Sequence, residues 1–105
     1  MSDPCSWCGT AVEADDGYRA YEPAGGRRAV FCRLEHLVPW AIRGAWWEPG
    51  EPVDGPRLRE CSLCGAALEE AHVLLVRSRG EHLVPDGFCN VPHLLDWAKA
   101  GGRYG

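Results

Sequence analysis

The chain has 105 residues, 46% hydrophobic and 25% charged, which excludes a disordered protein and leaves room for one ordinary domain or two very small ones. Its formal net charge of −4 disfavours non-specific binding to nucleic acid, and no stretch approaches the roughly 20 apolar residues that cross a membrane. The N-terminal residues lack the features of a signal peptide, so we expect a cytoplasmic protein with reduced cysteines and no membrane partner.

The first half of the chain predicts a cysteine knuckle, a β-hairpin and a short helix, in that order. Cys5 and Cys8 form a C-x₂-C turn followed by Gly9, at a position that often needs positive φ. Two short strands are expected at 18–21 and 28–31, on either side of a Gly-Gly pair. An apolar, helix-compatible run extends from Leu34 to a stop at Gly44, and Pro39 within it would kink the helix or delay its start.

A Pro- and Gly-rich linker at 45–57 leads into a second half with the same plan. Cys61 and Cys64 form the second knuckle. A strong strand is expected at 72–77 and a weaker one at 82–84, with a turn at 78–81 between them. The apolar run from Val91 to Gly101 favours a second helix. We therefore expect two zinc-stabilised α+β modules, at 1–44 and 58–105, joined by the linker.

The two halves are an internal repeat. The sequence CSWCGTAVE at 5–13 returns as CSLCGAALE at 61–69, and FCRLEHLVPWA at 31–41 returns as FCNVPHLLDWA at 88–98. Of these 20 aligned positions 12 are identical, and the two blocks keep the same order and nearly the same separation in both copies. A matching order at nearly constant offset indicates duplication of one small structural unit.

Each repeat carries a complete set of ligands for one Zn²⁺. The pattern is C-x₂-C, then 23 or 24 residues, then C-x₃-H, and it uses all six cysteines of the chain. Three thiolates and one imidazole satisfy a tetrahedral zinc ion, and units of about 50 residues usually need such a metal. Two ligands four residues apart are expected on one side of a helix. We predict two structural zinc ions per chain, held by Cys5, Cys8, Cys32 and His36 and by Cys61, Cys64, Cys89 and His93.

Two other uses of the same residues stay open at this point. The cysteines could form three disulfides or remain as buried thiols, although this leaves the equivalent His36 and His93 unexplained. A cross-braced arrangement could instead combine ligands from both repeats around each ion. His72 and His82 fall outside the repeat pattern and are expected on the surface rather than on a metal.

The order of knuckle, hairpin and helix resembles the treble-clef zinc fingers. Within that group, VFCRLEH and GFCNVPH resemble the F-C-x₃-C element of the TRASH, MYM and FCS-type fingers. This chain has His36 and His93 where those fingers commonly have a cysteine. The resemblance implies a treble-clef fold for each repeat. It also implies a role either in metal trafficking and sensing or in binding protein or nucleic acid.

The expected function is that of a small protein-interaction module rather than an enzyme. Adjacent Trp46 and Trp47 in the linker are candidate anchors for a protein partner, or they fill the seam between the modules. Nucleic-acid binding is the alternative, on arginine patches that the net charge disfavours, and metal trafficking or sensing is another. Ser6 and Ser62 lack an obvious base, and no catalytic constellation is evident. The candidate arginines are Arg27, Arg28, Arg33 and Arg43 in the first module and Arg57, Arg59, Arg77 and Arg79 in the second.

Overall fold

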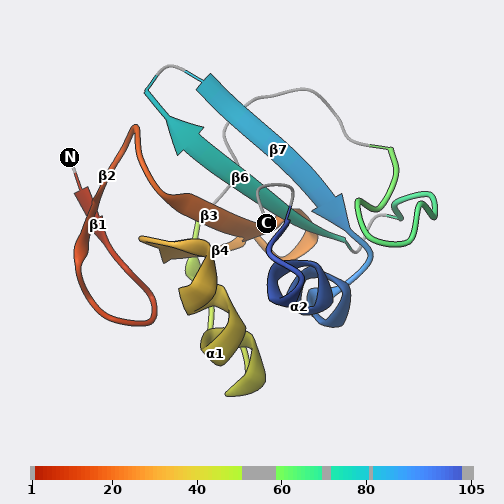
Figure 1. The fold of residues 1–105 in the computed structure, drawn as a ribbon, viewed down its shortest axis with the longest axis horizontal. Helices are drawn as coiled ribbons and strands as arrows, with labels where there is room; N and C mark the ends of the chain where they lie inside the picture. The colour runs from red at the N-terminus through yellow and green to blue at the C-terminus, as the bar shows by residue number, and fades with distance from the viewer. Residues whose placement is uncertain (1, 51–58, 70–71, 81, 103–105) are drawn as a thin grey trace.

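The two repeats are joined through a single antiparallel sheet (Figure 1). The structure is a computed structural model that describes residues 2–50, 59–69, 72–80 and 82–102. The strand order is β5-β4-β3-β6-β7, and each repeat contributes one hairpin. The first hairpin is formed by β3 (Tyr18–Glu22) and β4 (Arg27–Phe31), and the second by β6 (Val73–Arg79) and β7 (His82–Phe88).

The hairpins meet through β3 and β6, which run antiparallel at the centre of the sheet. Tyr18 lies opposite Phe31 and Val73 opposite Phe88, so Tyr18 of the first hairpin corresponds to Val73 of the second. Continuing two positions along each strand, Ala20 corresponds to Leu75, and these two residues are partners across the β3–β6 ladder. The repeats are therefore related by a pseudo-twofold axis that passes through this pair.

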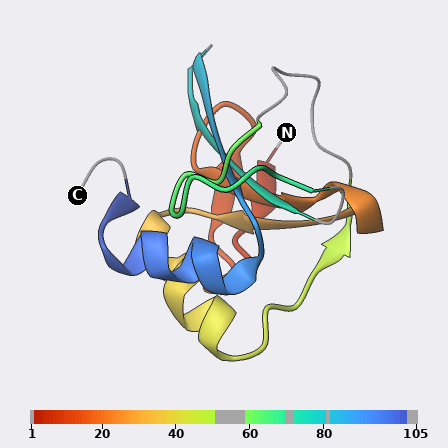
Figure 2. The same ribbon diagram turned by 90° about the vertical axis from the view of Figure 1, so that its right-hand side faces the viewer.

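Two helices cover one face of the sheet and lie side by side (Figure 2). They are α1 (Leu37–Ile42) and α2 (Val91–Lys99). Trp40 of α1 packs on Phe31 with ring centroids 5.0 Å apart, and Trp97 of α2 packs on Phe88 at 5.2 Å. These pairs belong to one buried cluster that draws residues from both repeats. Each repeat thus completes its core only against the other.

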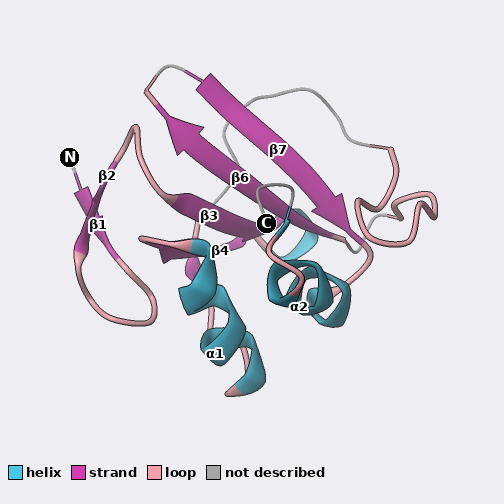
Figure 3. Cartoon of the chain, viewed as in Figure 1, coloured by secondary structure: helices cyan, strands magenta, loops and turns pink. Residues whose placement is uncertain are grey.

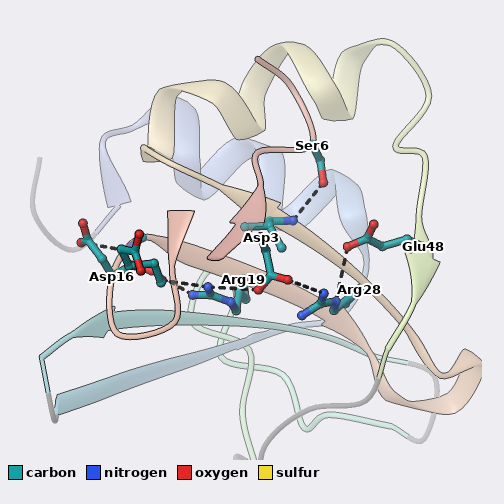
Figure 4. Close-up of polar contacts among 9 residues, drawn as sticks. Asp3, Ser6, Asp16, Arg19, Arg28 and Glu48 are labelled. Carbon is teal, nitrogen blue, oxygen red and sulfur yellow. Dashed lines mark hydrogen bonds and ion pairs between the residues drawn. The ribbon is translucent and has the colours of Figure 1, made fainter. Parts of the chain in front are cut away.

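A two-stranded ribbon lies beside the first hairpin (Figure 3), against the face that carries Val30. It consists of β1 (Ser2–Pro4) and β2 (Ala11–Glu13), and Val12 packs with Val30 beneath it. Asp3 fastens the ribbon, because its carboxylate accepts from Arg28 at 2.9 Å and from the buried Arg19 at 3.4 Å (Figure 4). Arg19 also donates to the backbone carbonyls of Asp16 and Glu13.

Replacing Asp3 by asparagine should destabilise the fold by about 1 kcal/mol at neutral pH, because Arg19 loses its ion pair and Arg28 keeps only the pair with Glu48. The hydrogen bond from Arg28 holds the pKa of Asp3 below its ordinary value. A lowered pKa contributes stability above the unfolded pKa of about 3.9 and loses it only as pH falls through the folded value. The difference from Asp3→Asn, measured by thermal unfolding, should therefore be constant between about pH 6 and pH 8.

Glu13→Gln is the matched control for Asp3→Asn, since it removes one charge from the same ribbon. The Glu13 side chain is exposed, and only its backbone carbonyl contacts Arg19. Equal losses of stability in the two variants would contradict a specific role for Asp3.

The predicted strands are confirmed, and the second hairpin is longer than expected. Both of its strands run for seven residues, so Ser78 and Arg79 belong to β6 rather than to a turn. Glu81 lies outside the described residues. Part of the predicted linker forms the edge strand β5 (Glu48–Pro49), which pairs with Arg27 and Arg28 of β4. Residues 51–57 of the linker also lie outside the described residues.

The first helix begins late, as Pro39 suggested. A 3-10 turn at Leu34–His36 comes first, and the α-helix begins at Leu37 with Pro39 in its first turn. Proline is tolerated there because the first backbone N–H groups of a helix have no partner within it. Within the part of the chain that the structure describes, no helix is long and apolar enough to span a membrane.

Candidate metal centres

The two knuckles have the same backbone structure. In the first, the N–H of Cys5 donates to Thr10 at 2.8 Å and that of Gly9 to Cys5 at 2.9 Å; in the second, Cys61 and Gly65 make the matching bonds at 2.8 and 2.9 Å. Gly9 and Gly65 have φ of 79° and 76°, a region that favours glycine. The positive φ predicted at Gly9 is confirmed, and Gly65 has the same conformation.

Each knuckle is fixed to the last strand of its own hairpin. The N–H of Ser6 donates to Val30 of β4 at 2.6 Å, and that of Ser62 donates to Gly87 of β7 at 2.7 Å. The Ser6 hydroxyl also accepts from the N–H of Val30 at 2.9 Å (Figure 4), whereas the Ser62 hydroxyl donates to the buried Asp86. Both serine side chains thus support the knuckles.

Cys32 and Cys89 lie at the ends of strands rather than on helices, so the prediction of two ligands on one helix face is wrong. Each cysteine directly follows β4 or β7, and the next residue, Arg33 or Asn90, has extended backbone and precedes the helical turn. His36 ends the 3-10 turn. His93 lies in the first turn of α2, where its N–H donates to the Asn90 side chain at 3.0 Å. Strand pairing holds each cysteine, and the helical turn returns the histidine to it.

The structure brings the four predicted residues of each repeat together around one point. In each set the four ligand atoms lie within 4.8 Å of one another. In the first set, Nδ1 of His36 lies 3.7 Å from Sγ of Cys5 and 3.2 Å from Sγ of Cys32, and the sulfurs of Cys8 and Cys32 are 3.6 Å apart. In both sets it is Nδ1 of the histidine that faces a cysteine sulfur.

These separations match the edges of a zinc tetrahedron. With Zn–S bonds of about 2.3 Å and Zn–N bonds of about 2.0–2.1 Å, two sulfurs lie about 3.8 Å apart and a sulfur lies about 3.6 Å from a nitrogen. In the second set, Cys64 and Cys89 are 3.7 Å apart, and Nδ1 of His93 lies 3.6 Å from Cys61. Two Cys₃His groups of this size are compatible with structural zinc binding.

Disulfides and a cross-braced arrangement do not fit this geometry. A disulfide needs an S–S distance of about 2.0 Å, and all six cysteines are free. A cross-braced arrangement needs ligands from both repeats at one point, whereas each group contains residues of one repeat only. The sequential arrangement is the one that the structure contains.

The thiol groups of each set differ in acidity. Hydrogen bonds with Thr10 lower the pKa of Cys8 to about 6, and burial raises the pKa of Cys32 to about 11. In the second set, burial opposes thiolate formation at Cys61, but the backbone N–H groups around it lower its pKa to about 6. Burial raises the pKa of Cys89 to about 11. Each set thus prepares a thiolate near neutral pH, and a bound dication would favour loss of the remaining thiol protons.

The two linker tryptophans differ in exposure. Trp47 is half-buried, packs edge-on against Trp40 at 5.0 Å and lies beneath the guanidinium of Arg27 at 5.7 Å. The side chain of Trp46 is 46% exposed, and its ring centroid lies 6.0 Å from that of Trp7. Both pack against aromatic residues of the first repeat, and Trp47 also borders the buried cluster that the two repeats share.

Three arginines of the patch predicted in the first repeat have separate partners. Arg27 pairs with Glu22, Arg28 pairs with Asp3 and Glu48, and Arg43 lies over the Trp7 ring. Arg57 lies outside the described residues.

The two histidines outside the repeat pattern lie on the second hairpin or beside it. His72 has Nδ1 2.6 Å from the Glu69 carbonyl oxygen, and it joins no metal group within the described part of the chain. The backbone of His82 begins β7, and its side chain lies outside what the structure describes.

Sequence reasoning missed three residues that shape these sites. Asn90 caps α2, and an Asn followed by Pro two residues later would have signalled the cap. Trp7 extends the aromatic group of the first helix, and Asp86 is a buried carboxylate beneath the second knuckle.

Comparison with known proteins gave no match to a family model, to a curated protein or to a solved structure.

Proposed function

We propose that each Cys₃His group holds one structural Zn²⁺ and that each repeat is a treble-clef-type finger. The observation that supports this most directly is the near-tetrahedral spacing of four soft ligand atoms in each repeat. Four protein ligands complete a zinc tetrahedron and leave no position for a catalytic water. The metals would therefore stabilise the fold rather than catalyse a reaction.

Zinc in these positions would join three elements of each repeat. The knuckle supplies two cysteines, the end of a strand supplies the third, and the first helical turns supply the histidine. The repeats share one sheet and one core, so either metal would also support the other repeat. A small chain gains from zinc the stability that its limited apolar core does not provide.

We further propose that this scaffold is a protein-interaction module whose anchor is Trp46. Nε1–H of the buried Trp40 donates to the Trp46 carbonyl at 2.9 Å, which fixes the backbone beneath an exposed indole. Trp7 lies beside this indole, and the guanidinium of Arg43 lies 5.7 Å from the Trp7 ring. We call Trp7, Arg43 and Trp46 the indole platform. Tryptophan and arginine on a rigid surface are the residues most often found at the energetic centres of interfaces.

The other candidate functions have weaker support. Arg27 and Arg28 are engaged in ion pairs, and the chain has a net charge of −4, which together leave little cationic surface for a phosphate backbone. Metal trafficking needs an exchangeable ion, whereas four protein ligands joined to a shared core favour a retained one. The hydroxyls of Ser6 and Ser62 are used within the knuckles, in keeping with a protein that is not an enzyme.

Replacing Trp46 by alanine should weaken partner binding at least tenfold and lower the folding free energy by less than about 1 kcal/mol. The partner would first be captured with wild-type protein and then purified, and its affinity would be measured by isothermal titration calorimetry. Leu83→Ala is the matched control, because Leu83 is an equally exposed apolar residue on β7. Equal affinity of the wild-type protein and Trp46→Ala for that partner would contradict the anchor role.

A further inference from the structure

An open hollow of about 440 Å³ lies where the two repeats meet. The loop at 16–18 and residues 32–35 of the first repeat form part of its wall, and the end of β6 forms another part. Three arginines line it, Arg33 of the first repeat and Arg77 and Arg79 of the second. Pairing of β3 with β6 thus gathers arginines that lie more than forty positions apart in the sequence.

The backbone around this hollow is firmly held. Tyr18 lies opposite Arg77 in the β3–β6 ladder, and the guanidinium of Arg77 lies 5.8 Å from the centroid of the tyrosine ring. The N–H of Ser78 donates to the backbone carbonyl of Gly17 at 2.8 Å, and the N–H of Gly80 donates to the backbone carbonyl of Asp15 at 2.8 Å. The backbone that carries the arginines of β6 is therefore held by hydrogen bonds to the first repeat.

The pseudo-twofold axis provides an internal comparison for these arginines. By the strand correspondence that relates Ala20 to Leu75, Arg77 corresponds to Glu22. By the correspondence of the two strand-end cysteines, Arg33 corresponds to Asn90. The matching corner of the molecule thus carries an acidic and a neutral residue. Since both repeats form the same elements, the fold does not require arginine at these positions.

The charges of the hollow favour an anion. The lining includes three arginines and two acidic residues, Asp16 and Glu35, and Cys32 of the first metal group also borders the hollow. One carboxylate oxygen of Asp16 already accepts the N–H of Gly17 at 2.8 Å. Arg33 and Arg79 are exposed and form no ion pair with any residue that the structure describes. Their guanidinium groups are therefore accessible to a ligand.

We propose that this hollow binds the terminal phosphate of a small phosphomonoester. Guanidinium groups present paired N–H donors that match phosphate oxygens, and several arginines around one point suit a dianion. A volume of about 440 Å³ is in the range of small-molecule sites. A nucleic-acid backbone would need an extended cationic track instead, and Arg27 and Arg28 are engaged by Glu22, Asp3 and Glu48.

Titration of the zinc-loaded protein with inorganic phosphate and with O-phosphoserine, followed by NMR of the arginine side chains, tests this site. Saturable shifts of Arg33, Arg77 and Arg79 are expected. The double variant Arg33→Ala/Arg79→Ala should bind at least tenfold more weakly, because two charge-assisted contacts are lost. Arg59→Ala, which removes an exposed arginine outside the hollow, should bind as the wild type does. Zinc content measured before and after each titration confirms that the fold is unchanged.

The two probes also distinguish the sources of the phosphate. Similar affinities would indicate a site for the free anion, and tighter binding of O-phosphoserine would indicate that the carrier of the phosphate is recognised too. Shifts that do not saturate, or equal affinities of the wild type and the double variant, would overturn the proposal. Tighter binding of a short DNA duplex through the same arginines would overturn it as well, in favour of phosphodiester recognition.

Discussion

Replacing Cys5 by alanine should remove one of the two zinc ions and abolish cooperative folding at 25 °C. Zinc binding to Cys/His sites contributes about 10–16 kcal/mol in small peptides, which is as large as the total stability of most domains, about 5–15 kcal/mol. Cys5 is buried against Val12 and Val30, so its loss also opens a small cavity. Native mass spectrometry and far-UV circular dichroism of the purified variant measure the two effects.

A conservative change at the same site provides the control for Cys5→Ala. His36→Cys replaces imidazole by thiolate and keeps four ligands, so it should retain two zinc ions and a cooperative melting transition. His36→Ala should lose one ion. A Cys5→Ala protein that still binds two zinc ions, or that melts within a few degrees of the wild type, would contradict a structural role for the first site.

The shared sheet predicts that damage to one site spreads to the other repeat. β3 and β6 pair directly, and the buried cluster contains Phe31 and Trp40 of the first repeat together with Phe88 and Trp97 of the second. Hydrogen exchange of Cys5→Ala should therefore show loss of protection in β6 and β7 as well as in β3 and β4. Protection retained in the second repeat alone would indicate two independently folding units.

Replacing Trp40 by alanine should lower the free energy of unfolding by about 3–5 kcal/mol, the largest effect expected away from the metal ligands. Trp40 is fully buried and contacts Phe31 and Trp47, with ring centroids 5.0 Å away in each case. The substitution leaves a cavity at the junction of helix and sheet. It also removes the donor to the Trp46 carbonyl, so the indole platform should lose its fixed position.

Trp46→Ala is the matched control for Trp40→Ala, because it removes the same side chain from the surface next to it. Urea unfolding of both variants at saturating zinc measures the two losses in the free energy of unfolding. A loss below about 1 kcal/mol in Trp40→Ala, or equal losses in the two variants, would contradict the assigned difference between core and platform.

The metal groups could be predicted from the sequence because the repeat carries them. The six cysteines and two histidines occur in the same order in both copies, at nearly the same distance along the chain. This order indicated that each repeat supplies all four ligands of one metal ion. The hairpins followed from short β-branched and aromatic runs. The late start of α1 followed from Pro39, whose ring excludes the interior of a helix but not its first turn.

The sequence did not predict how the repeats combine. Pairing of β3 with β6 joins strands more than fifty residues apart, and its register depends on which faces of both hairpins are buried. Strands β1 and β2 have three residues each and β5 has two. Strands this short cannot show the alternation of apolar and polar residues from which a strand is predicted. The convergence of Arg33 with Arg77 and Arg79 could not be foreseen either, because it depends on the pairing of β3 with β6.

The position of Cys32 and Cys89 shows why spacing alone grouped the residues correctly but predicted the wrong local structure. A separation of four residues fits one turn of α-helix, but it equally fits a strand end followed by one extended residue and a helical turn. The second arrangement is the one found, because the strand ladders reach Phe31 and Phe88 directly before each cysteine.

Native mass spectrometry of protein purified without added metal tests the central claim most directly. The two Cys₃His groups predict two zinc ions per chain. When a chelator removes the ions, far-UV circular dichroism should show loss of secondary structure. Protein that carries no metal, or that keeps its sheet and helices after complete removal of zinc, would contradict a fold held together by two metal sites.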